Sequence, residues 1–349
     1  MTATIAPPTD PRLSAEGSAP TADSTPPPPT GPRLDRPTSS WSKRWSVLSL
    51  LAAAATLYFT REPLFVIGLL FVAVVPFERI FPRHRGQRFR RPQLAGDIAH
   101  ALVSPAMQIV TAIVAVPLAV GSLAWLPGLA IRPLVAMIPP AIMPFVAVAL
   151  FDFIIYWTHR WAHEVPFFWK FHAIHHSTEH LDWVSGFRNH PLDGVFLAPG
   201  FVFLLAAGFD PEVAGVLVIV QVVTGLFLHA NVRWRWRPLH RIVITPEFHH
   251  WHHSNERDAH CSNYSVFLPL WDIIFGTYFM PKNRRPAIYG VDEDIPVGLV
   301  PQLLHPVRGM GNPLRWVRHP IQGVRRGSHW TRAIVGQMWR TARRPTGRR

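Results

Sequence analysis

Three clusters of histidine stand out in this 349-residue chain: HRWAH at 159–163, HAIHH at 172–176 and HHWHH at 249–253. Residues three or four positions apart lie on one face of a helix, so each cluster can direct two or three rings into one pocket. The neutral imidazole is the commonest metal ligand and suits iron, zinc, copper and nickel. The clusters therefore predict a metal site.

The number of histidines predicts two metal ions. The second and third clusters share the spacing H-x-x-H-H, and His229 stands at the end of the apolar stretch that separates them. Eight or nine imidazoles exceed the roughly six positions around a single ion. A dinuclear site is the expected arrangement.

The elements that must position these histidines are long apolar runs. The last of them is interrupted by GFDPE at 208–212, which predicts a helical hairpin with its turn at Asp210-Pro211. We expect an all-α integral membrane protein of about four to six transmembrane helices, with a cytosolic helical cap that holds the dinuclear site. The runs are 47–59, 64–77, 98–131, 133–157 and 192–228.

The charge distribution predicts the orientation in the membrane. The formal net charge is +14, and the arginines gather beside apolar runs and in the C-terminal tail, which argues against a nucleic-acid binder. The segment RHRGQRFRR at 83–91 is expected in the cytoplasm. An even number of crossings then places both histidine-rich blocks on that side. The membrane would be the cytoplasmic membrane of a bacterium or the endoplasmic reticulum of a eukaryote.

Composition divides the chain into four expected regions. Residues 1–44 form a disordered Pro-rich tail, because they cannot bury enough apolar surface to fold. A transmembrane hairpin and basic loop follow at 45–94, and the membrane domain with the histidines occupies 95–280. Residues 281–349 form a basic tail, expected to lie on anionic headgroups.

The histidine clusters and their flanking segments resemble the fatty acid hydroxylase and sterol desaturase superfamily of membrane di-iron proteins. FRNHP at 187–191 is similar to that family's R-x-H-P segment, and TPEFHHWHHS at 245–254 to its third histidine box. NYSVFLPLWDIIFGTY at 263–278 resembles its closing stretch, with Ser265 where glycine is usual. The resemblance covers about residues 95–280.

The resemblance implies two iron ions, with O2 as co-substrate, that hydroxylate or desaturate a C–H bond of a lipid such as a sterol, carotenoid or fatty acyl chain. Electrons would come from a separate ferredoxin- or cytochrome-type donor, since the chain has neither a haem-attachment motif nor a nucleotide fingerprint. The ligands it implies, by position, are His159, His163, His172, His175, His176, His229, His249, His252 and His253.

Other polar residues are candidates to orient these rings or to line the substrate path. A metal-bound imidazole usually donates its second ring nitrogen to a carboxylate or carbonyl. His190 is expected beside the metals or on the substrate path, and His250 either beside them or at the surface. The candidate carboxylates are Asp152, Asp182, Asp193, Glu247 and Asp272.

Two other classes of protein remain as alternatives. A histidine-rich membrane metal transporter would place ionisable residues inside its spans, whereas these histidines fall at span ends. A zinc-dependent membrane hydrolase needs only three protein ligands and a nearby base, fewer than this chain offers.

Overall fold

The computed structural model describes residues 74–88, 90–123, 125–233, 237–308 and 320–343. No β-strand forms among them, and their only extended pairings are two isolated bridges, Pro82 with Val232 and Ser254 with Tyr289. The predicted all-α class is confirmed. The expected tail at 1–44 and most of the expected hairpin at 45–94 lie outside the described residues.

The helices are α3 (Leu94–Gly121), α4 (Leu126–Val135), α5 (Met143–Glu164), α6 (Pro166–His176), η1 (Trp183–Phe187), η2 (Gly194–Leu197), α7 (Ala198–Ala206), α8 (Pro211–His229), η3 (Arg237–Leu239), α9 (Pro246–His252), η4 (Arg257–Ala259), α10 (Leu270–Ile274), α11 (Leu299–Leu304) and α13 (Pro320–Arg343).

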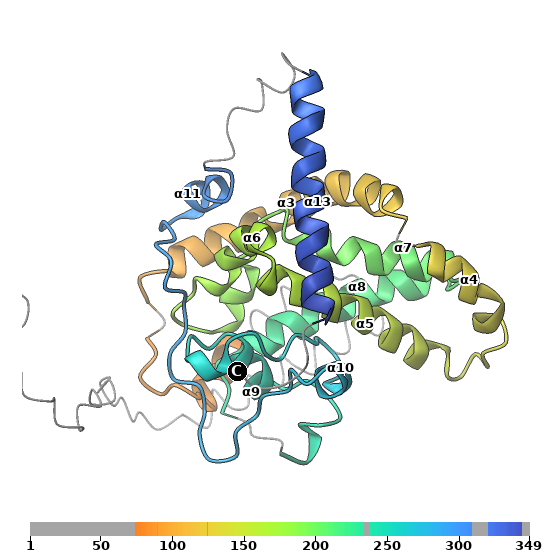
Figure 1. Ribbon diagram of the computed structural model, residues 1–349. Helices are drawn as coiled ribbons and strands as arrows, with labels where there is room; N and C mark the ends of the chain where they lie inside the picture. Colours follow the sequence, from red (N-terminus) through yellow and green to blue (C-terminus); the bar gives the residue numbers. More distant parts are fainter. Residues whose placement is uncertain (1–73, 89, 124, 234–236, 309–319, 344–349) are drawn as a thin grey trace, which may run out of the picture.

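The bundle that carries the site is built from α3, α4, α5, α7 and α8 (Figure 1). Helices α4, α5, α7 and α8 share a core in which Phe151, Ile155 and Leu204 are buried. Helix α4 packs closely on α7, since a Cβ at Gly128 would lie 2.6 Å from the carbonyl oxygen of Phe203. Glycine at this position therefore lets the two backbones approach.

The hairpin turn predicted at Asp210-Pro211 is confirmed. Helix α7 ends at Ala206, and Gly208 turns the chain with a φ of 91°. Helix α8 then begins at Pro211, and the Asp210 carboxylate accepts a hydrogen bond of 3.0 Å from the backbone N–H of Glu212. Proline in the first turn and an acidic N-cap are the usual start of a helix.

The predicted boundaries of the two preceding apolar stretches were wrong. Helix α3 bends by 61° between Leu94–Ser104 and Ala106–Gly121, and α4 runs through Pro133, where the two stretches were divided. Helix α5 continues past Trp157 to Glu164. Its last turn stays ordered because polar groups pair there, with the Arg160 guanidinium donating to Glu164 at 2.9 Å.

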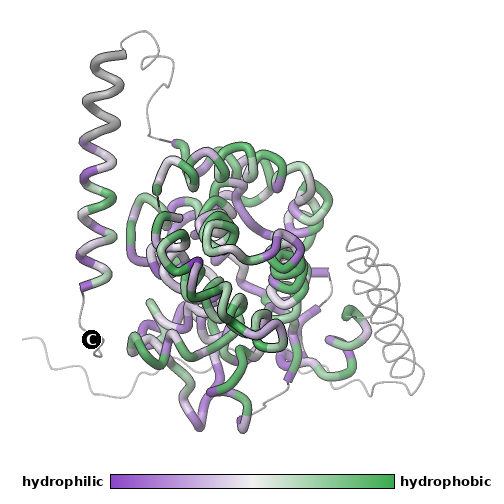
Figure 2. Tube along the Cα trace, turned by 90° about the vertical axis from the view of Figure 1, so that its right-hand side faces the viewer, coloured by the Kyte–Doolittle hydropathy of each residue, from purple (hydrophilic) through white to green (hydrophobic). Residues whose placement is uncertain are grey.

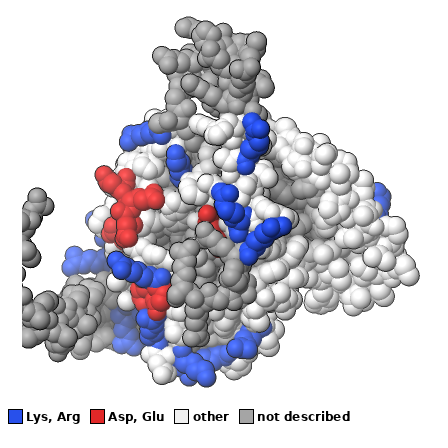
Figure 3. Space-filling view, in the orientation of Figure 1, with Lys and Arg blue, Asp and Glu red and all other residues white. Residues whose placement is uncertain are grey.

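One face of the bundle is apolar and almost free of charged side chains. Over α4 and α7 the surface in Figure 3 is nearly all uncharged, and hydrophobic segments dominate the bundle in Figure 2. Leu102, Ile113, Met137 and Phe145 are 68–78% exposed. Soluble proteins rarely expose so large an apolar area. Of the described helices, α8 is long and apolar enough to cross a membrane, and the two halves of α3 would together form a second such span.

Helix α13 runs across the outside of the bundle and contacts α5 (Figure 1). Its described outer face mixes exposed aromatic and basic residues, with the Arg343 guanidinium 4.5 Å from the ring centroid of Trp339. From His305 to the C-terminus the sequence has 11 arginines and no acidic residue. Tryptophan and arginine on one helix face are typical of helices that lie at a membrane surface.

Candidate metal centre

Four helix ends bring the histidine clusters together. His159 and His163 occupy the last two turns of α5, and the extended residue Val165 turns the chain directly into α6. Helix α6 ends on the second cluster, and α8 ends at His229. The third cluster lies at the end of α9, with His253 as the C-cap, and this helix begins where the Thr245 hydroxyl accepts a hydrogen bond from the backbone N–H of Phe248.

All nine histidines predicted as ligands converge into two groups. Each histidine contributes one ring nitrogen to its group. Within each group these nitrogens all lie within 4.8 Å of one another. The two groups adjoin, since the stacked rings of His176 and His253 have centroids 4.1 Å apart. The five-histidine group contains His159, His163, His172, His176 and His252, and the four-histidine group contains His175, His229, His249 and His253.

The distances between Nε2 atoms are those of ligands around an ion. His159 and His172 approach at 3.2 Å, His163 and His252 at 3.2 Å, and His229 and His253 at 3.1 Å. Two nitrogens bound to one ion at about 2.1 Å lie about 3.0 Å apart at a right angle and about 3.4 Å apart at the tetrahedral angle. The observed distances between Nε2 atoms fall between these two values.

The second ring nitrogen of five of these histidines donates to a fixed acceptor. Backbone carbonyls accept the Nδ1–H groups of four rings, at 2.7–3.0 Å, and the Asp193 carboxylate accepts that of His172 at 2.9 Å. A hydrogen bond from Nδ1–H fixes the tautomer and leaves the Nε2 lone pair for the metal. The four carbonyl acceptors belong to Tyr264 for His159, Arg188 for His175, Gly225 for His229 and Ser262 for His252.

Burial keeps five of these histidine rings, in the second and third clusters, neutral. Desolvation, together with the neighbouring imidazoles, lowers the pKa of His175, His176, His249, His252 and His253 well below the usual value of 6.5. At neutral pH these rings are therefore uncharged, which is the form that binds a metal ion.

The donor set fits two metal ions. The Nε2 atom of His176 is buried, points into the five-histidine group and has no hydrogen-bond partner. A buried polar atom without a partner is costly unless something else satisfies it. Two adjoining sets of neutral nitrogen donors suit divalent transition metals, and a coordinated ion would satisfy the His176 nitrogen as well.

Among the candidate carboxylates, Asp193 accepts a hydrogen bond from a ligand histidine, His172. Replacing Asp193 with asparagine keeps an acceptor oxygen but removes the charge beside His172. Changes of this kind weaken metal binding by about 10- to 100-fold. We expect this loss in a competition titration with a metal chelator. The matched control is Asp210→Asn, at the distant turn before α8, which should titrate like the wild type; equal affinities for all three proteins would contradict the assigned role of Asp193.

Asp152 and Asp272 do not contact an imidazole, contrary to expectation. The Asp152 carboxylate accepts hydrogen bonds from three consecutive backbone N–H groups, those of Val266, Phe267 and Leu268, at 2.9–3.0 Å. Asp272 accepts from the N–H groups of Tyr264 and Ser265. Loop amides satisfy both buried carboxylates. The two carboxylates therefore hold the loop in place, and the Tyr264 carbonyl of this loop accepts the Nδ1–H of His159.

Asp182 and Glu247 also lie away from the ligand rings. Asp182 forms an ion pair with Arg91 at 2.7 Å and caps η1. Glu247 lies 3.9 Å from both His240 and Arg285. These three partners, Arg91, His240 and Arg285, are not members of the two histidine groups.

His190 and His250 both lie outside the two groups. His190 lines the cavity described below, as one of its two predicted roles requires, and donates to the carbonyl of Leu303 at 3.1 Å. His250 is completely buried, so the surface position considered for it was wrong. Its Nε2–H donates to the carbonyl of Ala230, and its Nδ1 accepts from Arg83.

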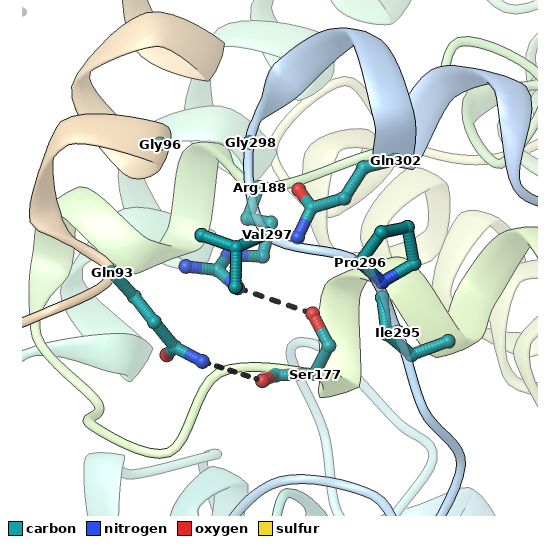
Figure 4. Close-up of a pocket in the computed structure, with 9 residues that line it drawn as sticks. All are labelled: Gln93, Gly96, Ser177, Arg188, Ile295, Pro296, Val297, Gly298 and Gln302. Atoms are coloured by element: carbon teal, nitrogen blue, oxygen red, sulfur yellow. Dashed lines mark hydrogen bonds between the residues drawn. The ribbon is translucent and has the colours of Figure 1, made fainter.

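Asp97 is a supporting residue that sequence reasoning missed. Its fully buried carboxylate pairs with both Arg91 and Arg188, and the carbonyl of Arg188 holds His175. Figure 4 shows Arg188 donating to the Ser177 hydroxyl, just beyond the end of α6, beside a hollow of only about 20 Å³. The sequence signal that could have identified Asp97 is its position as an isolated acidic residue at the start of an apolar stretch.

A cavity of about 550 Å³ leads to the histidines from between α3 and α8. Five of the nine ligand candidates line its inner end, and its walls are mainly apolar. The cavity therefore gives an elongated apolar molecule access to the two histidine groups. The histidines at its inner end are His159, His172, His175, His229 and His249.

Fold and site together define a helical protein with a histidine-rich candidate dinuclear metal centre. The family model for fatty acid hydroxylase matches residues 144–277. An ornithine lipid hydroxylase of Rhizobium tropici is 32% identical over 252 residues, which are 70% of this chain and 76% of that protein. The chain belongs to the fatty acid hydroxylase family.

Other relatives match shorter parts. Human alkylglycerol monooxygenase is 34% identical over 144 residues, 41% of this chain and 32% of that protein. A very-long-chain aldehyde decarbonylase of rice is 28% identical over 148 residues, 36% of this chain and 21% of that protein. The chain thus spans about a third of the alkylglycerol monooxygenase. No solved structure matches.

Proposed function

We propose that this protein is a membrane-bound, O2-dependent di-iron oxygenase that hydroxylates or desaturates a C–H bond of a lipid. The observation that carries the proposal is the convergence of nine imidazoles in two adjoining groups at the inner end of a largely apolar cavity. The names of the relatives support it, since they are an ornithine lipid hydroxylase, an alkylglycerol monooxygenase and a very-long-chain aldehyde decarbonylase.

Two iron ions would be held by the five-histidine and the four-histidine group. Bound there, they would supply the oxidising power from O2 that acid and base side chains lack. The Nδ1–H bonds to Asp193 and to the four carbonyls hold the rings in position, and the apolar walls exclude water from the reacting carbon. Electrons would come from a separate donor of the ferredoxin or cytochrome type.

The apolar surface and the ends of the chain support a membrane location. The α8 span, the exposed apolar side chains of α3 and α4, and the basic helix α13 suit a bilayer and its anionic surface. We propose four to six spans within the regions 45–94 and 95–280, flanked by a disordered tail at 1–44 and a basic tail at 281–349, with the histidines on the cytoplasmic side. The basic segment at 83–91 supports that orientation.

The test is metal and oxygen analysis of the purified protein in detergent or nanodiscs. We expect about two irons per chain, and O2 consumption that requires both a reductant and a lipid. A protein that contains zinc and hydrolyses lipids without O2 would favour the hydrolase alternative. Metal uptake into sealed vesicles without O2 consumption would favour the transporter. Folded protein that binds no metal would refute the proposal.

A further inference from the structure

The cavity between α3 and α8 has polar side chains in otherwise apolar walls. On α3 the lining residues recur every three or four positions from Ser104 to Val116, and on α8 from Val218 to His229. Each helix therefore turns one continuous stripe toward the cavity. Within these stripes, glutamine occurs once on each helix, as Gln108 and Gln221.

The protein leaves both glutamine amides largely open to a ligand. Gln108 is exposed and makes one long hydrogen bond, 3.5 Å, to the Ser104 hydroxyl, and the half-buried Gln221 has no side-chain partner among the described residues. Gln221 lies near the middle of α8, the helix apolar enough to cross a membrane. Polar side chains at such depth are costly and usually serve a ligand.

The cavity walls also restrict the charge of that ligand. Apart from the histidines, Asp193 is the one acidic or basic residue among those that line the cavity, and its carboxylate already accepts the hydrogen bond of His172. An ionised headgroup would therefore enter without a counter-charge, at a high desolvation cost. A glutamine amide instead matches an uncharged group that both donates and accepts hydrogen bonds.

The position of Gln221 on α8 sets its distance from the metal centre. It lies eight residues before His229 on the same helix, which at 1.5 Å per residue is about 12 Å. We propose that Gln221 and Gln108 bind an uncharged polar group of the substrate, an amide or hydroxyl, about 12 Å from the carbon that is oxidised. This inference rests on the proposed lipid oxygenase function and narrows its substrate class.

The first test is binding without turnover, under anaerobic conditions in nanodiscs. The probes are a dialkyl secondary amide and the alkane of equal length, each competing with a fluorescent alkyl probe. We expect the amide to bind about tenfold more tightly than the alkane, the effect of one or two hydrogen bonds. Gln221→Met, which keeps length but removes the amide, should abolish this preference, and Gln108→Met should reduce it.

The control is Val216→Leu on the opposite, exposed side of α8, which should keep the tenfold preference. Metal content equal to the wild type would show that each variant retains its fold. Equal binding of amide and alkane by the wild type, or an undiminished preference in Gln221→Met, would overturn the inference.

A turnover experiment distinguishes a failure of this inference from a failure of the proposed function. With iron, O2 and reductant, the wild type should oxidise the amide at a carbon about 12 Å from the amide group, located by mass spectrometry, and Gln221→Met should scatter that position. Oxidation at scattered positions by the wild type would refute the inference alone. A wild type that binds the amide preferentially but oxidises neither probe would instead refute the proposed function.

Discussion

Replacing His253 with alanine is expected to remove one metal ion and abolish lipid oxidation. His253 belongs to the four-histidine group, so the variant leaves only three imidazoles there, whereas the five-histidine group stays complete. Metal content should fall from about two to about one per chain. Oxidation should fall by about a thousandfold or more, because metal-ion catalysis contributes several kcal/mol to transition-state stabilisation.

Two comparisons make this prediction specific. His252→Ala leaves four ligands in the five-histidine group and should retain more of its ion than His253→Ala. His260→Ala removes an exposed histidine outside both groups and should keep full metal content and activity. Elemental analysis and product formation measure all three variants. A His253→Ala protein that keeps two ions would contradict the assignment of His253 to the metal centre.

Replacing Asp152 with alanine is expected to destabilise the protein more than any change at its surface. The substitution would leave three N–H groups, on Val266, Phe267 and Leu268, without their acceptor. An orphaned buried group costs about 1–3 kcal/mol, so the total is several kcal/mol of the free energy of unfolding. The melting temperature should fall by about 10 °C or more.

The same variant should also loosen the metal centre indirectly. The released segment follows Tyr264, whose carbonyl accepts the Nδ1–H of His159 at 2.7 Å. Asp294→Ala is the matched control, because it removes an exposed carboxylate and should leave the melting temperature unchanged. Thermal unfolding of both variants in the same detergent provides the comparison. A melting curve of Asp152→Ala that overlays the wild type would show that the carboxylate does not hold the loop.

The α7–α8 hairpin was predictable because local chemistry specifies it. Asp210 caps, Pro211 starts the helix and Gly208 takes a positive φ, so the turn needs no distant partner. The boundaries around Pro133 and Trp157 were not predictable from the apolar pattern. There the helices continue because of packing and of pairs such as Arg160 with Glu164, which apolar periodicity does not register.

The supporting residues show the same limit. Asp152, Asp193 and Asp272 look alike in the sequence as isolated acidic residues beside apolar stretches. Only Asp193 reaches an imidazole, whereas the other two are satisfied by backbone amides. Which donors a buried carboxylate meets depends, in the case of Asp152, on a chain segment more than 100 residues away.

The sequence by itself determined the donors: nine imidazoles at helical spacing, and hence pairs such as His159 and His163 that share a helix face. Only the tertiary structure decided how they are divided. His172 and His176 join one group while His175, between them, joins the other, and His252 is likewise separated from His249 and His253. Spacing within a helix fixes neighbours one turn apart, but the partner across the pocket depends on how α5, α6, α8 and α9 pack.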